Sequence, residues 1–189
     1  AWAALFEEYR LKRLKSFLDP WADPFNEGFQ LTQALIAVGR GEWFGVGLGA
    51  SVQKLFYLPE AHTDFILAVI AEELGFFGVL LVIALFAWLV GCGLRIGLRA
   101  LERGQRFGGY CAFGVSLMLA IQALVSIGVN LGVLPTKGLT LPLISSGGSS
   151  VLMTCAAIGL LARVSYELTR AEDAAAQAVS SPESPGEAE

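Results

Sequence analysis

The sequence predicts an all-α protein, a polytopic bundle of three transmembrane helices with a long extracytoplasmic loop. Hydrophobic residues make up 54% of its 189 residues and charged residues only 16%, and the mean hydropathy is +0.60. This balance is too apolar for an ordinary soluble domain. The charges are also grouped, so that long uncharged runs lie between them. The net charge of −4 offers no basic surface for nucleic acid, and membrane lipids are the expected surroundings.

The first membrane span is expected near residues 66–94. From Leu74 to Leu94 there are 21 residues without a charge, and a bilayer needs about 20 apolar residues in a helix. Glu72 and Glu73 lie directly before this run, where a carboxylate is costly. We therefore expect a polar pocket or a wet cavity to face them.

Two further spans are expected near residues 108–133 and 146–163. The first of these lies in an uncharged stretch of 30 residues, 107–136, and the second ends at Arg163. A basic hairpin at residues 95–106 should connect the first two spans.

A polar stripe runs along the second span, where Gln122, Ser126 and Asn130 recur every four residues. Residues four apart lie on one face of a helix. Two interpretations stay open: the stripe makes hydrogen bonds between helices, or it lines a groove for a substrate.

Residues 1–65 form a region of their own, expected outside the cytoplasm. Residues 29–38 predict one short helix that lies at the membrane interface or re-enters the bilayer. The glycine-rich stretch 39–49 follows. Its backbone N–H groups suit a diphosphate, but no strand precedes it and no Gly-Lys-Ser/Thr closes it, so a tightly turned structural loop is favoured. The cations near this loop are Arg40 and Lys54.

The two ends of the chain give weaker signals. From Ala171 onward there are five acids and no basic residue, so residues 167–189 are expected to form a disordered acidic cytoplasmic tail. Residue 1 is Ala, and the opening apolar run is too short to span a bilayer. We therefore expect a longer protein, of which this is the C-terminal half.

Lysines and arginines in the short connections predict the orientation. The hairpin holds four arginines, and Arg163 and Arg170 follow the third span, whereas Lys137 is alone between the second and third spans. This distribution places the hairpin and the C-terminus in the cytoplasm. The segment before residue 66 then lies outside, although it carries six cations of its own.

Three titratable residues, Glu60, His62 and Asp64, fall within five positions at the start of the first span. Partial desolvation at such a junction raises the pKa of a carboxylate toward the range of a general base, and a nearby like charge such as Glu60 acts in the same direction. The alternative is a helix cap, because Thr63 and Asp64 are both good N-cap residues. His62 is the only histidine, so it cannot make a zinc site and has at most a positioning role.

The stretch 135–149 breaks the helical pattern with prolines and glycines, among them Gly147 and Gly148. It carries Lys137 and several hydroxyls, including Ser145 and Ser149. Irregular backbone beside a bilayer persists only where it is buried in protein or lines water. This Gly/Pro/Ser loop, expected on the extracytoplasmic side, is therefore a candidate site on physical grounds.

Two motifs also carry a resemblance to a known family. LPEAHTDFI followed by IAEELGFFG, and LPTKGLTLPLISSGGSS from Leu134 to Ser150, resemble the signatures of the SEDS family (shape, elongation, division, sporulation). Lys137 in the second motif is similar to the residue of the cell-division member. Ser146 departs from the family, which often has an aromatic residue there.

The resemblance implies a multi-pass inner-membrane peptidoglycan glycosyltransferase that polymerises lipid II during septal cell-wall synthesis. Asp64 matches the family's essential acidic position. Lys137, Arg40 and Lys54 are the cations expected to face the undecaprenyl diphosphate, with a divalent cation, Mg²⁺ or Mn²⁺, as a further candidate. Glu60, His62, Ser145, Gly147, Gly148 and Ser149 complete the expected substrate-binding set. A class B penicillin-binding protein, which is the division transpeptidase, and other divisome proteins are the expected partners.

Two other functions remain open at this point. A lipid II flippase would use the polar stripe as a translocation path, and a non-enzymatic membrane scaffold would only recruit a division transpeptidase. This part of the chain alone is not expected to be active, because the N-terminal half of the family supplies much of the substrate groove.

Overall fold

The computed structural model describes residues 21, 28–51, 62–135 and 138–180. Within these residues the regular structure is helical, as predicted, and consists of α2 (Phe29–Gly41), α4 (Ile66–Glu102), α5 (Arg106–Asn130) and α6 (Gly148–Ser180). Three helical segments are long and apolar enough to cross a membrane: Ile66–Glu102, Arg106–Asn130 and Gly148–Ala174.

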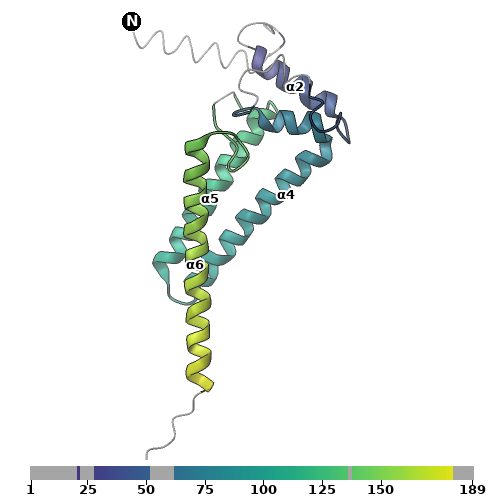
Figure 1. Cartoon of the computed structure of the whole chain (residues 1–189). Coiled ribbons are helices and arrows are strands. Elements are labelled where there is room, and N and C mark those ends of the chain that lie inside the picture. The colour runs from purple at the N-terminus through teal and green to yellow at the C-terminus, as the bar shows by residue number, and fades with distance from the viewer. Residues whose placement is uncertain (1–20, 22–27, 52–61, 136–137, 181–189) are drawn as a thin grey trace, which may run out of the picture.

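The helices form an elongated bundle with two distinct ends (Figure 1). At one end, called the loop end here, lie α2, the turn His62–Phe65 and the irregular residues 131–135 and 138–147 between α5 and α6. At the opposite end, the turn end, residues Arg103–Gln105 connect α4 to α5. Helix α6 runs past the turn end.

Helix α4 is broken near its start. Gly75 has φ 68° and ψ −161°, which is not a helical conformation, and divides α4 into a first segment Ile66–Leu74 and a longer second segment. Glycine adopts a positive φ without a Cβ penalty. In Figure 1 the first segment runs across the loop end, and the second descends to the turn end.

The glycine-rich loop forms backbone hydrogen bonds with α4 on both sides of this break. The N–H groups of Val46 and Gly47 donate to the carbonyls of Glu72 and Glu73 at 2.9 and 3.1 Å. The N–H of Phe76 in turn donates to the Glu42 carbonyl at 2.9 Å. Each of these backbone groups would otherwise lose its helical partner at the kink, which is costly for a buried chain.

This hydrogen bonding favours the structural interpretation of the loop, although the loop begins at Glu42 and not at residue 39, because residues 39–41 belong to α2. The N–H groups of Val46 and Gly47, which a diphosphate would need, already bond to α4. The loop also lies close against the broken helix: a Cβ on Gly75 would lie 2.4 Å from the Gly45 nitrogen.

Small residues bring α4 and α5 together near the turn end. A Cβ on Gly97 would lie 3.2 Å from the carbonyl oxygen of Gly109, and one on Gly109 would lie 3.1 Å from that of Gly97. Small residues at a crossing allow helix backbones to approach closely, as is usual between membrane helices.

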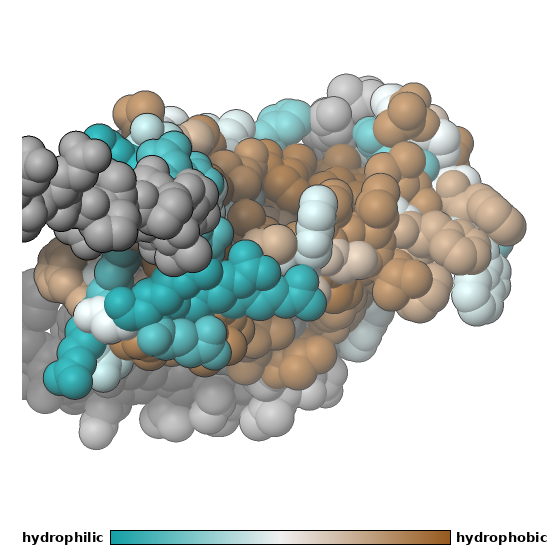
Figure 2. All heavy atoms as spheres, turned by 90° about the horizontal axis from the view of Figure 1, so that it is seen from below, coloured by the Kyte–Doolittle hydropathy of each residue, from teal (hydrophilic) through white to brown (hydrophobic). Residues whose placement is uncertain are grey.

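The surface of the bundle is rich in exposed apolar side chains. Seen from the turn end, hydrophobic residues cover much of the described surface, and hydrophilic residues gather in a group beside them (Figure 2). The large exposed side chains on the three long helices include Leu81, Leu85, Trp88, Leu117, Ile121, Leu124, Leu152 and Met153. An apolar exterior of this extent suits a lipid environment rather than water.

Two predicted boundaries were wrong, both because charges do not end a helix. Helix α4 continues past residue 94 through Arg95 and Arg99 to Glu102, so the expected hairpin at 95–106 is reduced to the turn Arg103–Gln105. Leu, Arg, Ala and Glu are good helix formers. A charged residue limits the part of a helix that crosses lipid, but the helix itself can continue into water.

Helix α6 also continues beyond its expected end at residue 163, and residues 167–180 are helical rather than disordered. This stretch is rich in Ala and Glu, which favour helix. Arg103 at the turn end forms an ion pair with Glu172, and its guanidinium also donates to the Leu168 carbonyl at 3.4 Å. The expected tail beyond residue 180 lies outside the described residues.

Candidate functional site

Asp64 lies in the turn His62–Phe65, at the loop end and directly before α4. The N-cap position of α4 is Phe65 and not Thr63 or Asp64, so the capping interpretation of these two residues was wrong. The capping contact comes instead from another helix, because the backbone N–H of Ala68 donates to Oδ1 of Asn130 at 3.1 Å. The Asp64 side chain is half-buried.

The second motif is bonded to the backbone of this turn. The Ser145 hydroxyl donates to the Thr63 carbonyl at 2.6 Å and accepts from the Leu141 N–H at 2.8 Å. Both the backbone N–H and the hydroxyl of Ser146 donate to the His62 carbonyl, at 3.0 and 2.9 Å. Segments more than 80 residues apart in the sequence therefore form one structural unit.

Gly138 brings the second motif against the Asp64 carboxylate itself. A Cβ built on Gly138 would lie 3.1 Å from Asp64 Oδ2 and 3.8 Å from its Cγ. The carboxylate thus faces the backbone of the Gly/Pro/Ser loop at the residue that directly follows Lys137 in the sequence. This contact makes the pair of motifs a single candidate site.

The remaining predicted residues have different positions. His62 is exposed in the turn, while Gly147, Gly148 and Ser149 lie at the start of α6, with Gly148 and Ser149 exposed. Ser145 is buried, and its hydroxyl is engaged within the chain as described above. Glu60, Lys54 and Lys137 lie outside the described residues.

Arg40 lies in the last turn of α2 and approaches Glu72 rather than the Asp64 turn. Its Nη1 is 3.5 Å from Glu72 Oε1, and the Ser51 hydroxyl donates to Glu72 Oε2 at 2.5 Å. Glu72 thus has polar partners from two other segments of the chain, whereas the polar pocket or wet cavity expected to face Glu72 and Glu73 stays a prediction.

The polar stripe of α5 makes hydrogen bonds within the bundle. The Gln122 amide donates to the Thr140 carbonyl at 3.2 Å, and Asn130 Nδ2 donates to the carbonyls of Asp64 and Ser126, each at 2.9 Å. Ser126 and Asn130 are fully buried. Of the two interpretations, these contacts favour hydrogen bonding between segments over the lining of a groove.

Asn130, Ser146 and Gly138 are the site residues that sequence reasoning did not select. The four-residue spacing of Gln122, Ser126 and Asn130 was a signal for Asn130, since it pointed to bonds between helices. Neither Ser146 nor Gly138 has a comparable local signal, because each acts through a turn that is distant in sequence.

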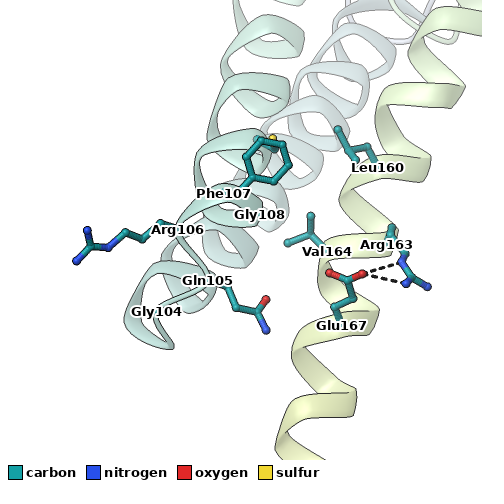
Figure 3. A pocket seen from close by; sticks show the side chains of 10 residues that line it. Gly104, Gln105, Arg106, Phe107, Gly108, Leu160, Arg163, Val164 and Glu167 are labelled. Carbon is teal, nitrogen blue, oxygen red and sulfur yellow. Dashed lines mark hydrogen bonds and ion pairs between the residues drawn. The ribbon is translucent and has the colours of Figure 1, made fainter.

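A cavity of about 620 Å³ lies at the turn end, away from Asp64. It lies between the start of α5 and the middle of α6 and is lined in part by Gln105, Phe107, Leu160, Val164 and Glu167 (Figure 3). Arg163 forms an ion pair with Glu167 at 2.9 Å, and Arg106 points away from the cavity. We do not include this cavity in the site, because it lies at the opposite end of the bundle from the Asp64 turn.

Across the described ranges, no group of three or more His, Cys, Asp or Glu side chains is close enough to hold a metal ion. Mg²⁺ commonly takes several of its ligands from substrate phosphates and from water.

Three membrane-spanning helices with a polar site at one end define a multi-pass membrane protein. A family model described as "Cell cycle protein" (FTSW_RODA_SPOVE) matches residues 1–170, and the chain belongs to this family. The match confirms the resemblance drawn from the two motifs.

The chain is similar to proteins named probable peptidoglycan glycosyltransferase FtsW. It is 66% identical over 168 residues to that of Xanthomonas oryzae pv. oryzae, which covers 89% of this chain and 35% of the relative. It is 62% identical over 167 residues to that of Thioalkalivibrio sulfidiphilus, covering 88% and 42%. The chain thus spans well under half the length of these relatives.

One solved structure has the same fold. It is described as "Structural coordination of polymerization and crosslinking by a peptidoglycan synthase complex". The match has a TM-score of 0.64 and 32% sequence identity, and it covers 85% of this chain and 42% of that chain.

Proposed function

We propose that this chain belongs to a peptidoglycan glycosyltransferase that polymerises lipid II during septal cell-wall synthesis, with Asp64 as the general base. The observation that carries the proposal is the contact between the Asp64 carboxylate and Gly138, which joins the two motifs into one site. The names of the relatives support the reaction class.

The reaction requires one proton transfer that a carboxylate can perform. The 4-hydroxyl of the acceptor sugar attacks the anomeric carbon of the donor sugar, a new carbon–oxygen bond forms, and the bond to undecaprenyl diphosphate breaks. Asp64 accepts the hydroxyl proton as this bond forms. Its half-buried position in the turn leaves part of the side chain accessible to a hydroxyl.

The leaving diphosphate needs positive charge nearby. Lys137 is the first candidate, because it directly precedes Gly138, whose backbone lies against Asp64. Arg40 is a weaker candidate, since its guanidinium approaches Glu72. A divalent cation bound through the diphosphate and water would add charge at the same place.

The same proposal gives location and partners. The basic residues of the turn end and of α6 support a cytoplasmic position for that end and for the C-terminus, with the Asp64 turn on the outer side of the inner membrane. A class B penicillin-binding protein at the division septum is the proposed partner, because newly polymerised strands need crosslinking. The solved relative, whose description couples polymerization with crosslinking, supports this pairing.

The test is Asp64→Asn in the full-length protein carrying this sequence, assayed for lipid II polymerisation. The amide keeps the size of the side chain but has no basic carboxylate, so we expect activity to fall by about 10²–10⁴-fold. Membrane level and binding of the transpeptidase should be retained. Glu167→Gln, in α6 toward the turn end, is the control. Activity of Asp64→Asn within about twofold of the parent would overturn the assignment and favour a flippase or a scaffold.

A further inference from the structure

Glu72 is a fully buried carboxylate, and with its neighbour Glu73 it is one of two charged residues in the first segment of α4, whose other residues are apolar. It lies in the last turn of the first α4 segment, Ile66–Leu74, three residues before the kink at Gly75. A buried charge is costly unless it has partners. Its two described polar partners, Ser51 and Arg40, come from other segments of the chain.

Three segments meet at this carboxylate. Arg40 belongs to the end of α2, and Ser51 follows the glycine-rich loop. The backbone is joined at the same place, since the Glu72 carbonyl accepts from the Val46 N–H at 2.9 Å. The end of α2 also packs closely against the first α4 segment: a Cβ on Gly41 would lie 1.8 Å from the Ala71 carbonyl oxygen, so no side chain fits at this position. Side-chain and backbone contacts thus attach one end of the Ile66–Leu74 segment to α2 and its loop.

The other end of the segment carries the Asp64 turn. The side-chain amide of Asn130 binds that end by donating to the Asp64 carbonyl and accepting from the Ala68 N–H. Nine residues make too short a helix to be stable alone, so its position depends on both attachments. Ile66, two residues after Asp64, and Glu72 are six residues apart, about 9 Å along the helix axis, so the segment can transmit a shift from Glu72 to the Asp64 turn.

We infer that Glu72 is a positioning residue for the reaction: by holding the Ile66–Leu74 segment against α2, it sets the place of Asp64 relative to Gly138. This inference rests on the proposed function for its catalytic consequence. The placement itself can be measured without any activity.

Disulfide trapping measures this placement. In a variant whose native Cys92, Cys111 and Cys155 are replaced by alanine, Asp64→Cys and Gly138→Cys form the reporter pair. A Cβ at position 138 lies 3.8 Å from Asp64 Cγ, near the place of a cysteine sulfur, so mild oxidation should link the two.

Glu72→Gln keeps the shape of the side chain but removes the charge that faces Arg40. We expect it to slow disulfide formation by about fivefold or more. The matched control is Glu167→Gln, which also loses an arginine partner, Arg163, but lies toward the turn end. Arg40→Gln alters a half-exposed side chain, so it is the milder variant, and it should slow the same reaction. Parental rates in both Glu72→Gln and Arg40→Gln would overturn the inference.

Kinetics separate positioning from substrate binding and from stability. With Asp64 present, Glu72→Gln in the full-length protein should lower kcat by about tenfold and leave KM within about twofold. A raised KM with unchanged kcat would overturn the inference and make Glu72 a binding residue. If Asp64→Asn retained activity while Glu72→Gln slowed trapping, the proposed function would fail and the placement by Glu72 would stand.

Discussion

Asn130 holds the backbone of Asp64 through a hydrogen bond of 2.9 Å from its side-chain Nδ2 to the Asp64 carbonyl. The same amide accepts from the Ala68 N–H at 3.1 Å and donates to the Ser126 carbonyl at 2.9 Å. A fully buried asparagine therefore bonds through both ends of its amide and gives α4 the capping contact that Phe65 cannot supply.

Asn130→Asp is predicted to destabilise the loop end. An ionised carboxylate has no N–H to donate, yet it would face the carbonyls of Asp64 and Ser126. Buried polar groups that lose their partners cost about 1–3 kcal/mol each, so the free energy of unfolding should fall by about 2 kcal/mol or more. Thermal unfolding in lipid nanodiscs measures this. Ile121→Ala, at an exposed position of α5, is the control, and an equal loss in both would contradict the role of Asn130.

Gly75→Ala is predicted to disrupt the junction between α4 and the glycine-rich loop. The positive φ of 68° alone costs about 1–2 kcal/mol for a residue with a Cβ. The added Cβ would also lie 2.6 Å from the Trp43 carbonyl oxygen, which is too close. We expect a stability loss of about 3 kcal/mol in denaturant unfolding. Gly91→Ala is the control, since nothing lies within 4 Å of its Cβ; if Gly75→Ala were equally mild, the kink would be unnecessary.

The three spans could be predicted from the sequence because bilayer thickness sets the length of an uncharged helical run. The kink could not. The break in α4 at Gly75 is stable because the backbone of Glu42–Gly47, some 30 residues earlier, forms hydrogen bonds with the α4 N–H and carbonyl groups that lose their helical partners there. The helix ends were missed for a related reason: Arg95 and Arg99 marked the end of the apolar run and not the end of α4.

The orientation of the bundle gives a prediction for chemical labelling. In a variant without the native cysteines, Ala50→Cys tests the loop end and Glu102→Cys tests the turn end, because both positions are exposed. The arginines of the turn end should keep it in the cytoplasm. A membrane-impermeant maleimide added to intact spheroplasts should therefore label position 50 and leave position 102 unlabelled until the membrane is opened. Labelling of position 102 alone would reverse the topology.

The candidate site was predicted less completely from the sequence than the membrane spans were. The sequence selected Asp64 from its place between charges and an apolar run, and the Gly/Pro/Ser loop from its irregular composition. It treated Arg40 as a cation for a diphosphate, whereas the structure brings Arg40 to Glu72. Ser145 was selected as a substrate ligand, but its buried hydroxyl bonds to the Thr63 carbonyl. The positions of Arg40 and Ser145 depend on contacts between segments far apart in the chain, and the local sequence pattern does not predict such contacts.

Gly138→Ala is predicted to lower turnover without weakening the fold. The new Cβ would lie 3.1 Å from Asp64 Oδ2, so the carboxylate must move by a few tenths of an ångström. A general base works only within hydrogen-bond reach of its proton, and small misplacements of reacting groups are costly. We therefore expect kcat for lipid II polymerisation to fall by about tenfold, with KM and the unfolding temperature close to those of the parent.

The control for this variant is Gly159→Ala, because a Cβ at that α6 position meets nothing within 4 Å. A second variant, Gly138→Ala combined with Asp64→Asn, should be no slower than Asp64→Asn alone, since the added methyl acts only through the carboxylate. If Gly138→Ala reduced the rate of the Asp64→Asn protein further by its full factor, the loop would contact the substrate directly, and the contact between Gly138 and Asp64 would not be the feature that governs catalysis.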